Sequence, residues 1–155
     1  MSLERRLLAA SGYLDLGMWS EAAAELDALP DGDRERSEAM SLRLDAHMAA
    51  KEWAAGAALA ARLVEREPER SGWWINYAYC TRRADSLQRA ELILLDACER
   101  HPREAMIFYN LACYASVSGR LEEARIRLDR AIALDSRVEL LARDDEDLAP
   151  LRQAG

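Results

Sequence analysis

The sequence predicts an all-α solenoid, a stack of antiparallel helical hairpins in which each hairpin contacts only its neighbours. Three observations lead to this prediction. A motif recurs every 34 residues, the apolar residues of each copy follow helical spacing, and the composition favours helices. The 155 residues include 29 Ala and 23 Leu but only 7 Gly and 4 Pro, which argues against a β sandwich or barrel.

The repeat appears in four segments that align without an insertion. They begin at residues 17, 51, 85 and 119 and read GMWSEAAAELDAL, KEWAAGAALAARL, DSLQRAELILLDA and GRLEEARIRLDRA. Each copy then holds two helical segments joined by a turn, and the copies span residues 3–36, 37–70, 71–104 and 105–138. We predict one domain, residues 1–155, in which residues 139–155 form a C-terminal cap.

The second helix of each copy carries an apolar stripe. A small residue is followed four residues later by a second stripe position and three residues after that by a third, which places all three on one helix face. The small position holds Ala22, Gly56, Ala90 and Ala124. In the first helices, Ala10, Leu44, Ala78 and Ala112 share a position. Small facing residues predict two closely packed helices, and stacking of neighbouring hairpins then buries the remaining apolar face.

Proline and serine residues predict where these helices begin and end. Pro68 and Pro102 should end the second helices of their copies, because proline cannot continue a helix. Ser37 and Ser71 are expected as N-caps of the next hairpins. Pro30 should shorten the second helix of the first copy.

This pattern resembles the tetratricopeptide repeat (TPR) over residues 3–138. The matching features are an aromatic residue in the first helix, a large residue followed by a small one, a small residue in the second helix and a closing proline. They are carried by Trp74, Phe108, Tyr77-Ala78, Leu111-Ala112, Ala22, Ala90, Ala124, Pro68 and Pro102. Repeat 1 departs from the pattern, because Arg6 stands at the aromatic position. The resemblance implies a right-handed superhelix whose first helices line a concave groove.

The resemblance also implies a protein-interaction module or adaptor without catalysis, which binds a protein or peptide segment in that groove. In repeat 2, the implied groove positions hold Glu38, Ser41, Leu42, Asp45, Met48 and Ala49. From the groove positions of repeats 2–4 we select Asp45, Ile75, Asn76, Tyr79, Arg82, Arg83, Met106, Tyr109, Asn110 and Cys113 as the candidate partner-binding residues.

Two features single out the later repeats. Asn76 and Asn110 are 34 residues apart and form a ladder on one surface. Asparagine is unfavourable inside helices, and its amide can grip a peptide backbone or bond to a neighbouring helix. Tyr79 and Tyr109 are expected as exposed anchors in the groove, with packing between hairpins as the alternative.

Charges leave further alternatives open. Arg82 and Arg83 end a first helix and can either meet an acidic partner or simply suit the helix dipole. The tail carries four consecutive acids, Asp144 to Asp147. We expect the tail to be a cap whose Leu141, Leu148 and Leu151 pack onto the last hairpin. The alternative is an interaction tail.

Composition and motifs exclude several classes of function. A net charge of −7 gives no overall attraction to nucleic acid or to an anionic membrane. Three cysteines and two histidines without metal-ligand spacing predict neither a metal site nor another cofactor, and no glycine-rich phosphate loop occurs. The odd cysteine number and the lack of a secretory start favour the cytoplasm. The excess of Arg over Lys, together with abundant Ala, suggests a bacterial source.

Two other functions stay open. A bacterial secretion-type TPR chaperone is similar in size and acidity but needs an additional N-terminal helix. A regulatory subunit of an enzyme is a remote alternative. The carboxylate clamp of chaperone-binding members is absent, because its positions hold Leu7, Ser11, Leu42, Gly72 and Asn76. The chain is expected to be a monomer or a weak homodimer.

Overall fold

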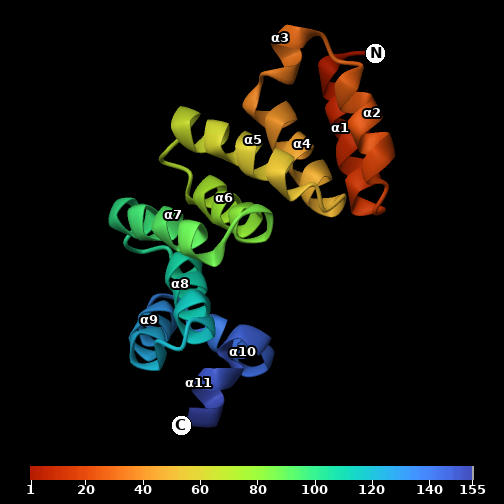
Figure 1. Ribbon diagram of the computed structural model, residues 1–155. Helices are drawn as coiled ribbons and strands as arrows, with labels where there is room; N and C mark the ends of the chain where they lie inside the picture. The colour runs from red at the N-terminus through yellow and green to blue at the C-terminus, as the bar shows by residue number, and fades with distance from the viewer. Residues whose placement is uncertain (155) are drawn as a thin grey trace.

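The computed structural model describes residues 1–154, and every regular element in this range is a helix (Figure 1). The predicted all-α class is therefore confirmed. Gly155, the last residue of the predicted cap, lies outside the described residues. The four hairpins are α1 (Leu3–Asp15) with α2 (Trp19–Asp27), α4 (Ser37–Ala49) with α5 (Trp53–Arg66), α6 (Ser71–Ala84) with α7 (Leu87–Arg100), and α8 (Ala105–Val117) with α9 (Leu121–Leu134).

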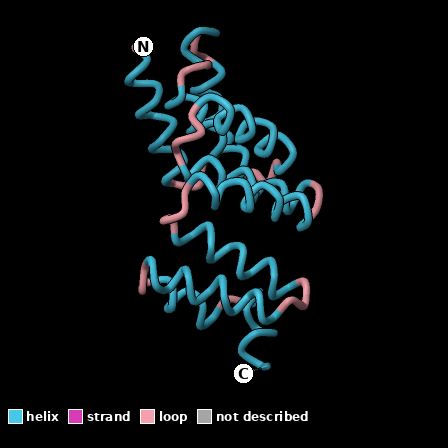
Figure 2. Tube along the Cα trace, turned by 90° about the vertical axis from the view of Figure 1, so that its left-hand side faces the viewer, coloured by secondary structure: helices cyan, strands magenta, loops and turns pink. Residues whose placement is uncertain are grey.

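The hairpins stack in chain order into a curved solenoid with the termini at opposite ends (Figures 1 and 2). Their first helices begin at residues 3, 37, 71 and 105, so the sequence period of 34 residues is also the structural period. The second helices α2, α5 and α7 each pack against their own first helix and against the first helix of the next hairpin, whereas α9 packs against α8 and the C-terminal helices. None of the described helices is long and apolar enough to cross a bilayer.

The small positions of the repeat lie where helices approach most closely. Ala22, Ala90 and Ala124 are fully buried, with 0% exposure. Gly56 occupies the same position in repeat 2, and a Cβ atom there would lie 2.9 Å from the Sγ atom of Cys80 on α6. The alanine-rich composition therefore follows from the close packing of hairpins.

The hairpin turns use a left-handed residue in three of the four repeats. Gly17 and Gly119 have φ angles of +74° and +81°, and Lys51 has a φ of +59° at the corresponding place. Lysine has a steric cost in this region that glycine avoids. In repeat 3 the turn is shorter, because α7 starts at Leu87 after the N-cap Ser86, whose hydroxyl accepts from the backbone N–H of Arg89.

The predicted helix ends are correct for proline and wrong for serine. The helices α5 and α7 end two residues before Pro68 and Pro102, and α2 is shortened before Pro30. Ser37 and Ser71 lie one residue inside their helices, with Arg36 and Arg70 at the N-cap positions. The Ser71 hydroxyl instead donates to Oε2 of Glu104 (3.0 Å), a contact between repeats 3 and 4.

The apolar interior is divided into two clusters. The larger cluster runs through repeats 2–4 and into the C-terminal cap. The smaller one joins α1 and α2 to Ala39 of α4, and its buried members are Ala10, Ala22, Leu26, Leu29 and Ala39. A one-turn helix, α3 (Asp31–Arg34), connects the first hairpin to the second and has no buried residue.

The cap consists of α10 (Val138–Asp144), the 3₁₀ turn η1 (Glu146–Leu148) and α11 (Ala149–Ala154). Leu148 and Leu151 are buried at 1% and 4% exposure, as predicted. The prediction for Leu141 is wrong, because this side chain is 53% exposed. The helix α10 buries Val138 and Ala142, four residues apart, which turns Leu141 toward solvent.

Candidate functional site

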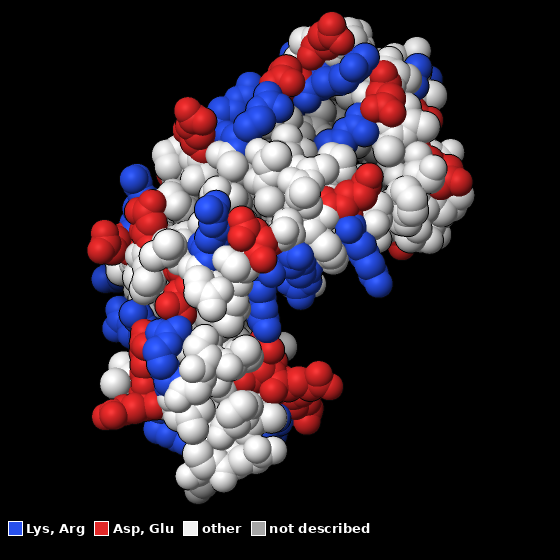
Figure 3. Space-filling model, viewed as in Figure 1, with Lys and Arg blue, Asp and Glu red and all other residues white. Residues whose placement is uncertain are grey.

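The acidic turn, residues 145–147, folds back onto the predicted groove. The elements η1 and α11 pack on α8, and η1 also reaches α6 through a side-chain contact. A cavity of about 250 Å³ lies at this junction, lined by Tyr79, Arg82, Arg83, Asn110, Cys113, Tyr114, Asp145 and Asp147. Figure 3 shows the concave side of the molecule on the right of the view, with basic side chains above the notch and acidic side chains below it.

Asp147 forms an ion pair with Arg82 across this hollow. The Nη1 and Nη2 atoms of Arg82 donate to the two carboxylate oxygens of Asp147, at 2.6 and 3.0 Å. Such a two-point contact fixes both side chains in direction as well as distance. The hydrogen bond to Asp147 raises the pKa of Arg82, so its guanidinium stays charged.

Asp145 is held by α8 and by its own turn. Its Oδ2 atom accepts a 2.7 Å hydrogen bond from the Tyr109 hydroxyl, and its Oδ1 atom accepts from the backbone N–H of Asp147 at 3.0 Å. The Cys113 Sγ atom lies 3.7 Å from the same Oδ2. The acidic turn therefore makes specific polar contacts with two successive first helices, α6 and α8.

The turn buries two residues that we expected in the open groove. Tyr109 is only 4% exposed and Cys113 only 3%, so the prediction of an exposed Tyr109 anchor is wrong. The physical reason is that the acidic turn covers the inner surface of α8 in addition to the end of the stack. Burial, followed by nearby acidic groups, raises the pKa of the Cys113 thiol, which keeps it protonated and unreactive at neutral pH.

Three potential metal ligands meet at the turn. The Cys113 thiol and one carboxylate oxygen each from Asp145 and Asp147 lie within 4.8 Å of one another. Each is already engaged, because Arg82 neutralises Asp147, Tyr109 donates to Asp145, and the thiol is protonated. A cation would have to displace the Arg82 guanidinium, so the arrangement suits an internal ion pair better than a metal ion.

Tyr79 stays accessible beside this cavity, at 39% exposure. Its ring packs edge-on against Trp53, with centroids 5.7 Å apart. The Arg83 guanidinium lies 3.4 Å from the Tyr79 ring centroid and 5.2 Å from that of Trp53. Trp53 is missing from the predicted site because it begins a second helix, and the groove positions are taken only from first helices.

The other predicted residues lie on the first helices α4, α6 and α8, which form the inner surface of the solenoid, and their exposure varies. Ile75, Asn76, Met106 and Asn110 are half-buried, while Asp45 lies at the surface. Partial desolvation raises the pKa of the Asp45 carboxyl. Within residues 1–154, neither the Asn76 amide nor the Asn110 amide has a side-chain hydrogen bond. The alternative in which these amides bond to neighbouring helices therefore finds no contact in this range.

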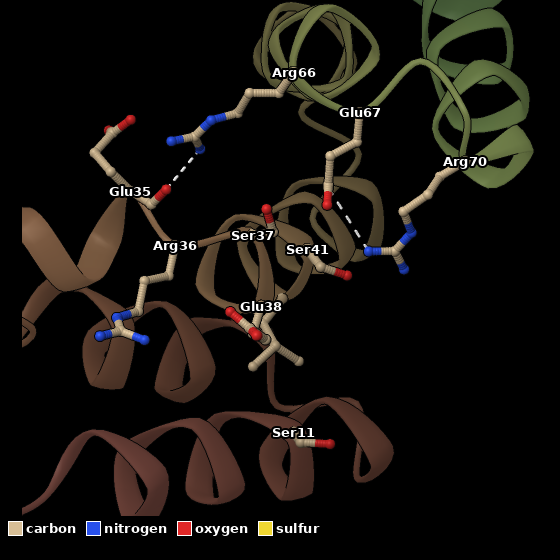
Figure 4. Close-up of a pocket in the computed structure, with 10 residues that line it drawn as sticks. Ser11, Glu35, Arg36, Ser37, Glu38, Ser41, Arg66, Glu67 and Arg70 are labelled. Carbon is tan, nitrogen blue, oxygen red and sulfur yellow. Dashed lines mark hydrogen bonds and ion pairs between the residues drawn. The ribbon is translucent and has the colours of Figure 1, made fainter.

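A second hollow lies at the N-terminal end of the inner surface. This pocket of about 830 Å³ is lined by Ser11 of α1, by Glu38, Ser41 and Leu42 of α4, and by charged residues of the connecting loops (Figure 4). Arg66 donates to the backbone carbonyl of Glu35 at 2.6 Å, and Arg70 pairs with Glu67 at 3.7 Å. Three of these residues stand at groove positions of repeat 2, although none belongs to the selected site.

Comparison with known proteins establishes the fold. No family model matches the sequence, and no curated protein matches it either. The structure is similar to a thermophilic TPR protein of Thermus thermophilus, at 18% identity and a TM-score of 0.71, covering 99% of this chain and 90% of that one. It is also similar to MamA of MSR-1, at 17% identity and a TM-score of 0.66, covering 98% and 94%. The chain has the TPR fold that the 34-residue period predicted.

Proposed function

We propose that this chain, with its TPR fold, is a protein-interaction module that binds an extended segment of a partner protein along its first helices. The observation that carries the proposal is the Asn110 amide, which lines the inner cavity beside Tyr79 and Arg83 without a hydrogen bond in residues 1–154. An amide offers both a donor and an acceptor to a peptide backbone. Asn76, one repeat earlier, offers the same groups.

The exposed aromatic cluster supports the same surface. Tyr79 and Trp53 present a rigid, partly polar face, and Arg83 places a positive charge over it. Such anchors commonly dominate the binding energy of protein interfaces. A separate open pocket at Ser41 and Leu42 offers a further concave surface at groove positions of repeat 2.

The proposal includes no catalytic step. The titratable groups that do converge are Cys113, Asp145 and Asp147, and they are engaged with one another and with Arg82. All three cysteines are free thiols, which is compatible with the reducing cytoplasm that we propose as the location. We further propose that the chain works as a monomer or weak homodimer.

The test is affinity capture with the tagged full-length chain, compared with the double variant N76A/N110A. Gln88 on the exposed side of α7 gives a matched amide control, Q88A. We expect specific partners to be recovered by the parent and by Q88A but at least tenfold less by N76A/N110A, in line with about 1.4 kcal/mol of lost binding energy. Equal recovery by all three proteins, with unchanged circular dichroism, would show that the inner surface is not the binding site.

A further inference from the structure

We infer that the inner surface at Arg82, Tyr109 and Asn110 is a receptor for a short acidic segment of a partner protein. In this structure the chain's own Asp145–Asp147 turn occupies the receptor. The inference rests on the proposed function, because it assigns the chemistry of the segment that the groove binds. It also makes the turn an internal competitor of that partner.

The contacts of the turn are those of a bound ligand. Asp147 receives two hydrogen bonds from Arg82, and Asp145 receives one from Tyr109. The donors come from two successive repeats, at groove positions where the fold would hold a partner. Two carboxylates at positions i and i+2 thus match a guanidinium on α6 and a phenol on α8.

Capping alone does not account for these contacts. The apolar end of the stack is covered by Val138, Leu148 and Leu151, which belong to the core cluster of repeats 2–4. Burial of these apolar side chains does not require the hydrogen bonds that Arg82 and the Tyr109 hydroxyl donate. The polar contacts reach further, to α6 of the preceding repeat.

The ion pair has the character of an exchangeable contact. The Arg82 and Asp147 side chains are 26% and 30% exposed, so water and salt reach them. Ion pairs at this exposure are weak and depend on ionic strength. Because the turn is part of the same chain, its effective concentration at the receptor is high, and a partner segment must outcompete it.

A partner segment can use groups that the internal turn leaves unused. The Asn110 amide lies in the same cavity and makes no hydrogen bond within residues 1–154. Arg83 is exposed beside it, and its guanidinium has no carboxylate partner in that range. An extended acidic segment that engages Asn110 and Arg83 in addition to Arg82 therefore gains contacts over the internal turn.

The test measures binding of a fluorescent synthetic peptide with the sequence of residues 140–151 to the full chain. The receptor is emptied by the double variant D145N/D147N. We expect this variant to bind the peptide about tenfold more tightly than the parent. A turn that occupies the receptor in about nine-tenths of the parent molecules lowers the apparent affinity for the peptide about tenfold. High salt should weaken the binding, and a peptide with Asn in place of the two aspartates should bind far less.

Three further variants make the result specific. R82Q in the D145N/D147N background should lose peptide binding. E146Q should behave like the parent, because Glu146 is an exposed neighbouring acid without a side-chain partner in residues 1–154. D147N alone keeps the hydrogen bond between Asp145 and Tyr109. Its affinity for the peptide should lie between those of the parent and the double variant, which provides a test even if the double variant does not fold.

The outcomes separate this inference from the proposed function. Equal peptide affinity for the parent and for folded D145N/D147N, or no peptide binding by either, overturns the inference that this surface is a receptor for an acidic segment. If partner capture still depends on Asn76 and Asn110 in that case, the groove binds a segment of other chemistry. If capture is independent of both asparagines as well, the proposed function also fails.

Discussion

Arg82 on α6 and Asp147 in η1 are 65 residues apart in the sequence, and they are joined by two parallel hydrogen bonds of 2.6 and 3.0 Å. This pair links the third repeat directly to the C-terminal cap. Most other contacts of the solenoid lie within one hairpin or between neighbouring hairpins, so the pair is a long-range constraint on a structure built from local ones.

Breaking this pair should lower stability modestly. R82Q and D147N are each expected to reduce the free energy of unfolding by about 0.5–1 kcal/mol, because the partners are only partly buried. The double variant should lose no more than either single variant. Urea denaturation measures this coupling, and R89Q, which breaks the exposed pair with Asp85, serves as a control with almost no effect. Additive losses in the double variant would contradict the proposed pairing.

Stability should fall at alkaline pH because groups under the cap resist ionisation. Burial raises the pKa of Tyr114 to about 12 and also raises those of Tyr109 and Cys113. A raised folded-state pKa means that stability is full below the unfolded-state pKa and decreases once the unfolded chain begins to release protons. The loss therefore begins near pH 9, the ordinary pKa of cysteine, and continues above pH 10, where tyrosine titrates.

Cys113 provides the means to check this. Between pH 8 and pH 10 the thiol alone should contribute a loss of about 1.4 kcal/mol, since the unfolded chain gains that much by deprotonating it. Urea denaturation at the two pH values should show a smaller loss for C113S than for the parent. The serine variant has a similar size and does not titrate in this range. An identical pH dependence for both proteins would show that the buried thiol is not responsible.

Replacing Lys51 by glycine should stabilise the chain. Its φ of +59° is costly for lysine, and the two glycines at the corresponding turns avoid that cost. We expect a gain of about 0.5–1 kcal/mol after the larger entropy of glycine in the unfolded chain is deducted. Thermal unfolding of K51G measures it. The control is A58G, which places glycine at an exposed position in the middle of α5 and should cost about 1 kcal/mol.

Gly56 should reject a methyl group only while Cys80 is present. In G56A the new Cβ atom would lie 2.9 Å from the Cys80 Sγ atom, and the overpacking should cost about 1 kcal/mol despite the better helix propensity of alanine. In a C80A background the space is free, and G56A should stabilise by about 0.5–1 kcal/mol relative to C80A. Urea denaturation of the four proteins gives the coupling energy directly. A coupling near zero would mean that the helices separate easily at this position.

The repeat architecture was predictable because it depends on a pattern that the sequence states four times. The small residues Ala22, Ala90 and Ala124 are buried as the spacing indicated, and the prolines end their helices. A repeat pattern constrains contacts between neighbouring hairpins, which is where the prediction succeeded.

The covered site was not predictable in the same way, since it depends on a segment outside the repeat. Four consecutive acids run from the last residue of α10 into η1, and nothing in their order indicates that Asp147 binds Arg82 or that Asp145 binds Tyr109. The same gap explains the wrong exposure of Tyr109, which depends on how far the tail turns back over α8. The exposure of Leu141 depends on which face of α10 packs on the stack, and that face carries Val138 and Ala142.

The division of the interior into two clusters has a consequence for how the molecule opens. The helices α1 and α2 share their small core only with α4, whereas repeats 2–4 share one continuous core with the cap. The first hairpin should therefore detach as a separate unit, and its amides should exchange with deuterium before those of α6 and α8. Hydrogen-exchange mass spectrometry would then record a chain that loosens in order, from the N-terminal hairpin toward the end secured by Asp147.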